Sequence, residues 1–147
     1  MKGGLDDVLK ILKQHQGEYI SGEEIGRKLG ISRVAVHKHV SKLKEKGYLI
    51  EASPKMGYRL IQTPDKIYPW EIKAKLQTRR LGREIIHFES ISSTQEVAEE
   101  LLESGCREGV VVVAEEQLAG RGRMGRIWFS PRGGLWCSVV LKPRIPT

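Results

Sequence analysis

Residues 117–131 read Gln-Leu-Ala-Gly-Arg-Gly-Arg-Met-Gly-Arg-Ile-Trp-Phe-Ser-Pro, and this stretch decides how the second half of the chain is interpreted. Three glycines alternate in it with Arg121, Arg123 and Arg126, and no carboxylate interrupts them. Glycine lets backbone N–H groups approach a ligand closely, and each guanidinium can hold a phosphate or a carboxylate through two hydrogen bonds. The stretch therefore predicts an anion-binding segment.

Three other interpretations fit parts of this segment. The three glycines have the spacing of a dinucleotide-binding turn, but that turn needs a helix directly after it, and residues 127–131 indicate a loop that leads into a strand. A protein-kinase glycine loop fits the strands predicted on either side, yet a kinase carries its catalytic motifs far downstream. A basic loop without a ligand is the third interpretation, and the adjacent rings of Trp128 and Phe129 disfavour it.

A second polar segment, residues 91–95, reads Ile-Ser-Ser-Thr-Gln and leads into a predicted helix over residues 94–104. Ser93 and Glu96 have the spacing of a capping box, which would place hydroxyls and free N–H groups at the start of the helix. Such groups suit a neutral polar ligand. Taken alone, however, the pattern favours an ordinary helix cap.

The first 64 residues predict a winged helix-turn-helix domain. Apolar residues at helical spacing over residues 5–12 define a first helix, and Ser21 with Glu24 forms a capping box that begins a second. Gly30 ends the second helix, and Ser32 caps a third over residues 33–46. Residues 48–61 then read as a hairpin, which is the wing.

The third helix is expected to read DNA. Val36, Val40 and Leu43 lie at i, i+4 and i+7 and should be buried, which turns small, polar and basic side chains outward, as a major groove requires. A helical hairpin with a purely structural role is the alternative. The DNA-binding residues expected on this basis are Ser32, Arg33, Val34, His37, Lys38, Ser41 and Lys42, with Lys55 at the tip of the wing to meet phosphate.

The net charge of +7 is concentrated in this first half. Residues 1–66 carry 13 Lys and Arg against 8 Asp and Glu, whereas residues 67–147 carry 12 against 10, and a phosphate backbone attracts such a surplus. The chain has no apolar run long enough for a membrane span and no signal-peptide core, so we expect a globular cytoplasmic protein. Cys106 and Cys137 are expected to be reduced thiols, and the four dispersed histidines predict no metal site.

The fold class predicted for the whole chain is α+β. Residues 65–82 are predicted to form a linker with a short helix over residues 70–77, and residues 83–147 to form strands around one helix. The residues expected to be buried by the two helices are Trp70, Ile72 and Leu76 in the first, and Val97, Ala98, Leu101 and Leu102 in the second.

Residues 91–95 and 119–131, together with the DNA-binding motif before them, resemble the bifunctional biotin protein ligases that are also repressors of biotin genes. The resemblance covers essentially the whole chain. It implies that residues 83–147 are the first part of an α/β ligase catalytic domain. It further implies that ATP and biotin form biotinyl-adenylate with Mg²⁺, that biotin passes to a lysine of the biotin carboxyl-carrier protein of acetyl-CoA carboxylase, and that an adenylate-bound homodimer binds operator DNA.

The resemblance also assigns the site. Arg121 and Arg123 would stabilise the charge that grows on the α-phosphorus when the biotin carboxylate attacks. Gln95 stands where the family usually has Asn, and Met124 stands where it often has Arg. The positions implied to contact biotin or the adenylate are Ser93, Thr94, Gln95, Gln117, Arg121, Gly122, Arg123 and Trp128.

Two alternatives to this assignment remain open. One is a DNA-binding protein whose ligase remnant binds no ligand, and the other is nucleotide binding by the glycine segment without biotin. The family's Lys-Trp-Pro-Asn-Asp segment, which carries its catalytic lysine, is not in the sequence, so we expect no biotinylation by this chain alone.

Overall fold

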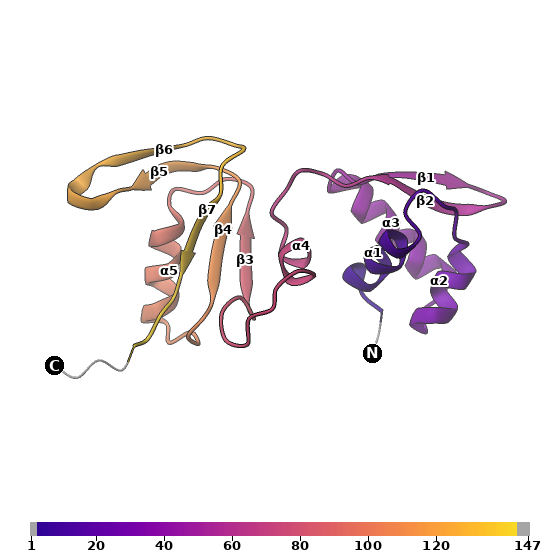
Figure 1. Ribbon diagram of the computed structural model, residues 1–147, viewed down its shortest axis with the longest axis horizontal. Helices are drawn as coiled ribbons and strands as arrows, with labels where there is room; N and C mark the ends of the chain where they lie inside the picture. Colours follow the sequence, from indigo (N-terminus) through magenta and orange to yellow (C-terminus); the bar gives the residue numbers. More distant parts are fainter. Residues whose placement is uncertain (1–2, 144–147) are drawn as a thin grey trace. The chain divides into compact units, whose positions relative to one another are not determined.

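The computed structural model describes residues 3–143, and Figure 1 shows the elements in chain order. The ends of the two predicted domains, residues 1–2 and 144–147, lie outside the described part. The chain divides between Asp65 and Lys66 into two compact units. The prediction of an α+β chain with an N-terminal helix-turn-helix is confirmed.

The first unit is built from three helices whose apolar faces meet. They are α1 (Leu5–Gln14), α2 (Gly22–Leu29) and α3 (Arg33–Glu45). The three residues expected to anchor α3, Val36, Val40 and Leu43, are all buried, as their spacing predicts. They pack in one core with residues from the other two helices, namely Val8, Leu9, Leu12 and Ile25.

The turn between α2 and α3 depends on two glycines. Gly30 adopts the left-handed conformation (φ 67°) that ends α2, and the N–H of Ile31 donates to the carbonyl of Gly26 at 3.0 Å. A Cβ at Gly26 would lie 2.6 Å from the carbonyl oxygen of Ile31, so only glycine allows the turn to pack this closely. The wing follows as β1 (Leu49–Ser53) and β2 (Gly57–Gln62), an antiparallel pair.

The second unit is organised around a three-stranded sheet in the order β3-β4-β7. These strands are β3 (Ile85–Phe88), β4 (Val111–Ala114) and β7 (Trp136–Val139). β4 pairs parallel with β3 and antiparallel with β7, and α5 (Thr94–Glu103) packs against β4 and β7. The central position of β4 explains the continuous apolar run in its sequence, because its residues are covered on both faces.

The glycine and arginine stretch forms a second, two-stranded sheet. β5 (Gln117–Arg121) and β6 (Ile127–Ser130) pair antiparallel, and a single 3-10 turn, Arg123–Gly125, joins them (Figure 1). The expectation of a loop at residues 127–131 is therefore wrong for its first four residues, which pair with β5. Because a strand and not a helix follows the glycines, the dinucleotide-binding turn is excluded.

Two predictions of burial are wrong. The short helix α4 (Pro69–Lys73) ends four residues earlier than predicted and has no buried residue, and Tyr68 immediately before it is buried instead. In α5, the apolar side that packs on the sheet is only half-buried, and Leu102 is exposed.

No helix within residues 3–143 has the length and apolar character needed to cross a membrane.

Candidate functional site

Two segments far apart in the sequence meet at the start of α5. The side-chain oxygen of Gln117 accepts hydrogen bonds from the backbone N–H of Thr94 at 2.8 Å and from its hydroxyl at 3.0 Å. The backbone supports this meeting, because Leu118 N–H donates to the carbonyl of Ile91 and Ala119 N–H donates to that of Ser92. Two of the residues expected to contact biotin, Thr94 and Gln117, are thus directly bonded to each other.

Hydroxyl groups surround this pair. The Thr94 hydroxyl lies 2.9 Å from that of Ser138 on β7, and the Gln117 amide nitrogen donates to the Ser130 hydroxyl on β6 at 3.0 Å. Ser93, Thr94 and Ser130 are each more than nine-tenths buried. Sequence reasoning did not include Ser130 and Ser138, because a single serine in a short strand carries no distinguishing pattern. The cluster offers hydroxyl and amide groups that can both donate and accept hydrogen bonds.

The start of α5 is not a capping box. Ser93 accepts a hydrogen bond from the N–H of Gln95 at 3.3 Å, and the Glu96 carboxylate turns away to pair with Arg121. A similar departure occurs at α2, where Ser21 caps the N–H of Glu24 but the Glu24 carboxylate pairs with Lys28 at 3.0 Å. Both predicted capping boxes therefore lack their carboxylate half.

The glycines in the arginine hairpin make room for neighbouring side chains. A Cβ at Gly120 would lie 2.7 Å from the Ser130 hydroxyl and 2.9 Å from the Gln117 amide nitrogen. A Cβ at Gly122 would lie 2.8 Å from the indole nitrogen of Trp128, whose ring lies against the glycine. These two glycines therefore position residues of the candidate site in addition to exposing backbone.

The arginines of the hairpin have different surroundings. Arg121 pairs with Glu96 through one guanidinium nitrogen, and another lies 3.9 Å from a carboxylate oxygen of Glu99. Arg123 and Arg126 are exposed at the turn, and neither forms an ion pair with any carboxylate in the described part of the chain. Only Arg121 is thereby held beside α5.

Gln95 has a different orientation from its neighbours. Its side chain is exposed and donates to Glu99 one turn further along α5, at 3.1 Å. With Ser138 it lines a shallow groove between α5 and β7. The structure thus bonds Thr94 to Gln117, whereas the side chain of the next residue, Gln95, is bonded to Glu99.

A buried polar cluster supports the strands behind the site. One oxygen of Glu115 lies 2.9 Å from the His87 ring nitrogen and also accepts the N–H of Ile67 at 3.1 Å. Nearby, hydrogen bonds from Lys66, and secondarily from Arg132, lower the pKa of Glu89. Burial raises the pKa of Tyr68, which stacks edge-on against His87. Sequence reasoning did not identify this cluster, whose members come from four separate segments.

Among residues 3–143, no three His, Cys, Asp or Glu side chains are placed together to hold a metal ion.

The candidate DNA-binding face lies on α3 and the wing. Arg33, Val34, His37 and Lys38 are exposed along α3, and Lys55 is exposed at the wing tip. Ser32 and Lys42 are also exposed, and Ser41 is half-buried.

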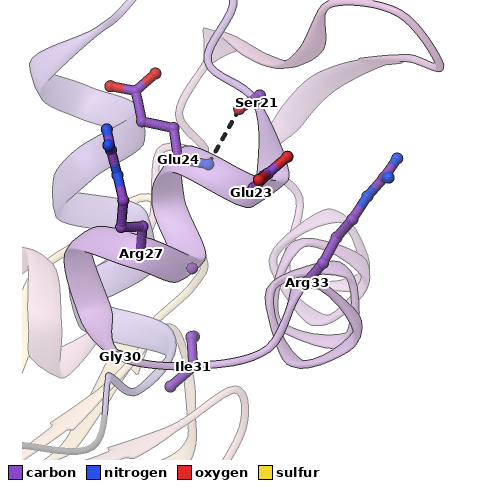
Figure 2. Close-up of a pocket in the computed structure, with 8 residues that line it drawn as sticks. Ser21, Glu23, Glu24, Arg27, Gly30, Ile31 and Arg33 are labelled. Carbon is purple, nitrogen blue, oxygen red and sulfur yellow. Dashed lines mark hydrogen bonds between the residues drawn. The ribbon is translucent and has the colours of Figure 1, made fainter.

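A hollow lies beside the start of α3. Figure 2 shows it, with Ser21 and Glu24 joined by a hydrogen bond on one side and Arg33 on the other. Arg27, which sequence reasoning did not assign to the DNA-binding face, also lines it. Arg27 and Arg33 therefore both line the hollow beside the first residue of α3, the helix that is expected to read the bases.

Comparison with known proteins agrees with both halves of this description. Residues 5–59 match an HTH domain family, and residues 87–147 match the biotin/lipoate A/B protein ligase family. The chain is 45% identical over 141 residues to the bifunctional ligase/repressor BirA of Bacillus spizizenii, which covers 95% of this chain. The chain is thus similar to a bifunctional ligase/repressor over nearly its whole length. The match includes 43% of the length of that relative.

The chain is also similar to a more distant bifunctional ligase/repressor and to a solved biotin protein ligase. The BirA of Escherichia coli is 35% identical over 117 residues, which is 80% of this chain and 35% of that relative. A solved structure of the biotin protein ligase from Aquifex aeolicus in complex with biotin and ATP is 40% identical. It overlaps 42% of this chain and 25% of that one, with a TM-score of 0.36. The chain thus spans less than half the length of the relatives it matches.

Proposed function

We propose that this chain carries the DNA-binding half and part of the biotin and adenylate site of a biotin-dependent repressor and biotin protein ligase. The observation that supports this most strongly is the hydrogen-bonded pair of Thr94 and Gln117, because it joins the two segments that the ligase family would need together. The similarity of the chain to the bifunctional ligase/repressor BirA of Bacillus spizizenii supports the same assignment.

Biotin would occupy the polar cluster at the start of α5. Its ring system is neutral, with a carbonyl that accepts and two N–H groups that donate, and the hydroxyls of Ser93 and Thr94 and the amide of Gln117 can satisfy either role. These groups are already hydrogen-bonded to one another, so a ligand that displaces those bonds would have to replace them, since a buried polar group left unpaired is costly. Gln95 would complete this side from the adjacent groove.

The adenylate would extend along the arginine hairpin. Arg121 lies closest to the polar cluster and would hold the biotin carboxylate or the phosphoryl group, and Arg123 at the turn would hold phosphate. As the carboxylate attacks the α-phosphorus, negative charge increases on the phosphoryl oxygens, so fixed guanidiniums stabilise this stage more than the ground state. Trp128 against Gly122 offers an aromatic surface near the adenylate.

The other components belong to the complete protein. ATP is the second substrate and would bring Mg²⁺ on its phosphates, and the carrier lysine would accept biotin. The exposed α3 residues would contact base edges in operator DNA, and Lys55 would contact phosphate. An adenylate-bound homodimer would present two such faces to two half-sites.

Calorimetric titration with biotinyl-adenylate tests the ligand site. We expect saturable binding by the wild-type chain and its loss in Gln117→Leu, which removes the amide and keeps a side chain of similar size. Ser104→Ala at the other end of α5 is the control and should bind normally. Absence of binding by the wild-type chain would support the alternative of a DNA-binding protein with an inactive ligase remnant. Binding of ATP without biotin would instead favour a simple nucleotide site.

A further inference from the structure

A group of basic side chains lies at one end of the second unit, where two hollows share Arg80 and Glu108. We name this region the basic hollow. Its basic residues are Arg79, Arg80, Arg83, Arg107 and Lys142, and its acidic residues are Glu84 and Glu108.

The topology of the sheet separates the basic hollow from the ligand site. Residues 79–84 precede β3 and residues 107–110 precede β4, so both segments lie at the amino ends of two parallel strands. Lys142 follows β7, which is antiparallel, and therefore reaches the same end. The ligand segments follow the carboxyl ends of β3 and β4, and Figure 1 shows the β5–β6 hairpin at that opposite end of the sheet.

Backbone hydrogen bonds fix the basic hollow. Gly82 N–H donates to the carbonyl of Gly109 at 2.8 Å, and Gly109 N–H donates to that of Val140, also at 2.8 Å. Gly109 has a φ of 91°, and a Cβ there would lie only 2.3 Å from the carbonyl oxygen of Arg80. This close approach brings the arginines before β3 next to Arg107 on a rigid frame.

The positive charges in the basic hollow are incompletely compensated. Arg80 pairs with Glu108 at 2.6 Å, and Arg83 donates to the carbonyl of Arg79 through Nε, which leaves its terminal nitrogens available. Within residues 3–143, Arg79, Arg83 and Arg107 form no ion pair with a carboxylate. Gathering like charges without partners is unfavourable unless an anion offsets it.

We propose that the basic hollow binds the phosphate backbone of duplex DNA, as a contact additional to that of the winged helix. Guanidiniums bind phosphate through paired hydrogen bonds, whereas the lining has no aromatic side chain on which a nucleotide base could stack. Because the second unit is covalently joined to the winged-helix unit, DNA bound by the winged helix is present at a high local concentration near the basic hollow. This inference rests on the proposed DNA-binding function.

The test compares two double variants that each remove two positive charges. R79Q/R107Q alters the basic hollow, and K73Q/K75Q alters exposed lysines outside it. Binding of a random-sequence duplex is followed by fluorescence anisotropy between about 50 and 200 mM salt. Because each phosphate contact contributes roughly 0.9 to the slope of log Kd against log salt, R79Q/R107Q should lower the slope by about 1.8. Its loss of affinity relative to wild type should therefore be about twelvefold larger at about 50 mM than at about 200 mM salt. K73Q/K75Q should leave both the slope and the affinity for the duplex nearly unchanged.

Several outcomes would overturn the proposal, and they can be told apart. Equal losses in both double variants would show that only net charge matters, and unchanged slopes in both would exclude a phosphate contact in the basic hollow. In either case the winged-helix function would stand. If the wild-type chain does not bind the duplex at all, the DNA half of the proposed function fails as well. If R79Q/R107Q loses binding to polyglutamate but not to DNA, the basic hollow serves an acidic protein surface instead.

Discussion

Replacing Glu96 by glutamine should increase the affinity for biotinyl-adenylate. Glu96 forms an ion pair with the guanidinium of Arg121, so the phosphoryl group of the proposed ligand would have to displace this carboxylate to bind Arg121. Glutamine removes the competing negative charge and also its repulsion of the incoming phosphate. The ligand then meets an arginine that is already free.

The expected size follows from the exposure of the pair. The side chains of Arg121 and Glu96 are 54% and 31% exposed, so the pair has the character of a surface ion pair. Such pairs contribute about 0.2 to 1 kcal/mol, which corresponds to roughly a 1.4-fold to fivefold gain in affinity. Glu99, at 3.9 Å from another guanidinium nitrogen, retains part of the interaction and keeps the gain below the upper value.

Calorimetric titration of wild-type and Glu96→Gln chains measures this gain. Glu103→Gln is the matched control, because it removes the same charge from an exposed position on α5. The effect of Glu96→Gln should disappear when Arg121 is already glutamine, as a double-mutant cycle requires of a direct interaction. A loss of affinity in Glu96→Gln would refute the reasoning, because it would mean that Glu96 orients Arg121 for the ligand and does not compete with it.

Three further predictions concern stability and local structure. Gln117→Ala leaves the buried Thr94 N–H without its acceptor and the Thr94 hydroxyl with only Ser138 as partner, and should lower the free energy of unfolding, measured in urea, by about 1 to 3 kcal/mol. Gly122→Ala places a Cβ against the Trp128 ring and should shift the tryptophan emission of the chain, a shift that Trp128→Phe would abolish. Hydrogen bonds lower the pKa of Glu89, so its contribution to stability is present above the ordinary value of 4.5 and is lost as the pH falls through the lowered one. Glu89→Gln should therefore reduce the loss of stability on acidification, and an unchanged pH profile would contradict this assignment.

The sequence predicted local features well because they depend on neighbouring residues. The spacing of Val36, Val40 and Leu43 identified the buried face of α3, and Ser32 does cap that helix. The strand at β4 was predicted by its apolar run. These signals are contained within one turn or one strand, so no knowledge of the tertiary fold was needed.

Features that depend on distant residues were not predictable in the same way. The capping box at α5 failed because Glu96 pairs with the distant Arg121, whereas the one at α2 failed locally, because Glu24 pairs with Lys28 one turn along the helix. The short helix at residues 69–73 has no buried side chain, because the packing contact is made by Tyr68 before it. Ser138 reaches Thr94 only through the antiparallel pairing of β7, which no local pattern encodes.

The glycine stretch illustrates a different difficulty. Its composition predicted close approach to an anion, and the structure adds a second requirement, since Gly120 and Gly122 accommodate Ser130, Gln117 and Trp128. A sequence records that a Cβ is absent but not which atom fills the space. Ligand binding and internal packing therefore leave the same pattern of residues.

The carboxylate of Glu115 joins the segment with which the second unit begins to the end of β4. It holds the amide of Ile67, in the segment with which this unit begins, and only Glu116 separates it from Gln117. Backbone bond geometry allows little slack over so few atoms. A displacement of Gln117 would therefore be passed through Glu116 and Glu115 to the hydrogen bond of Ile67. Ile67 lies next to Lys66, the residue at which the second unit begins.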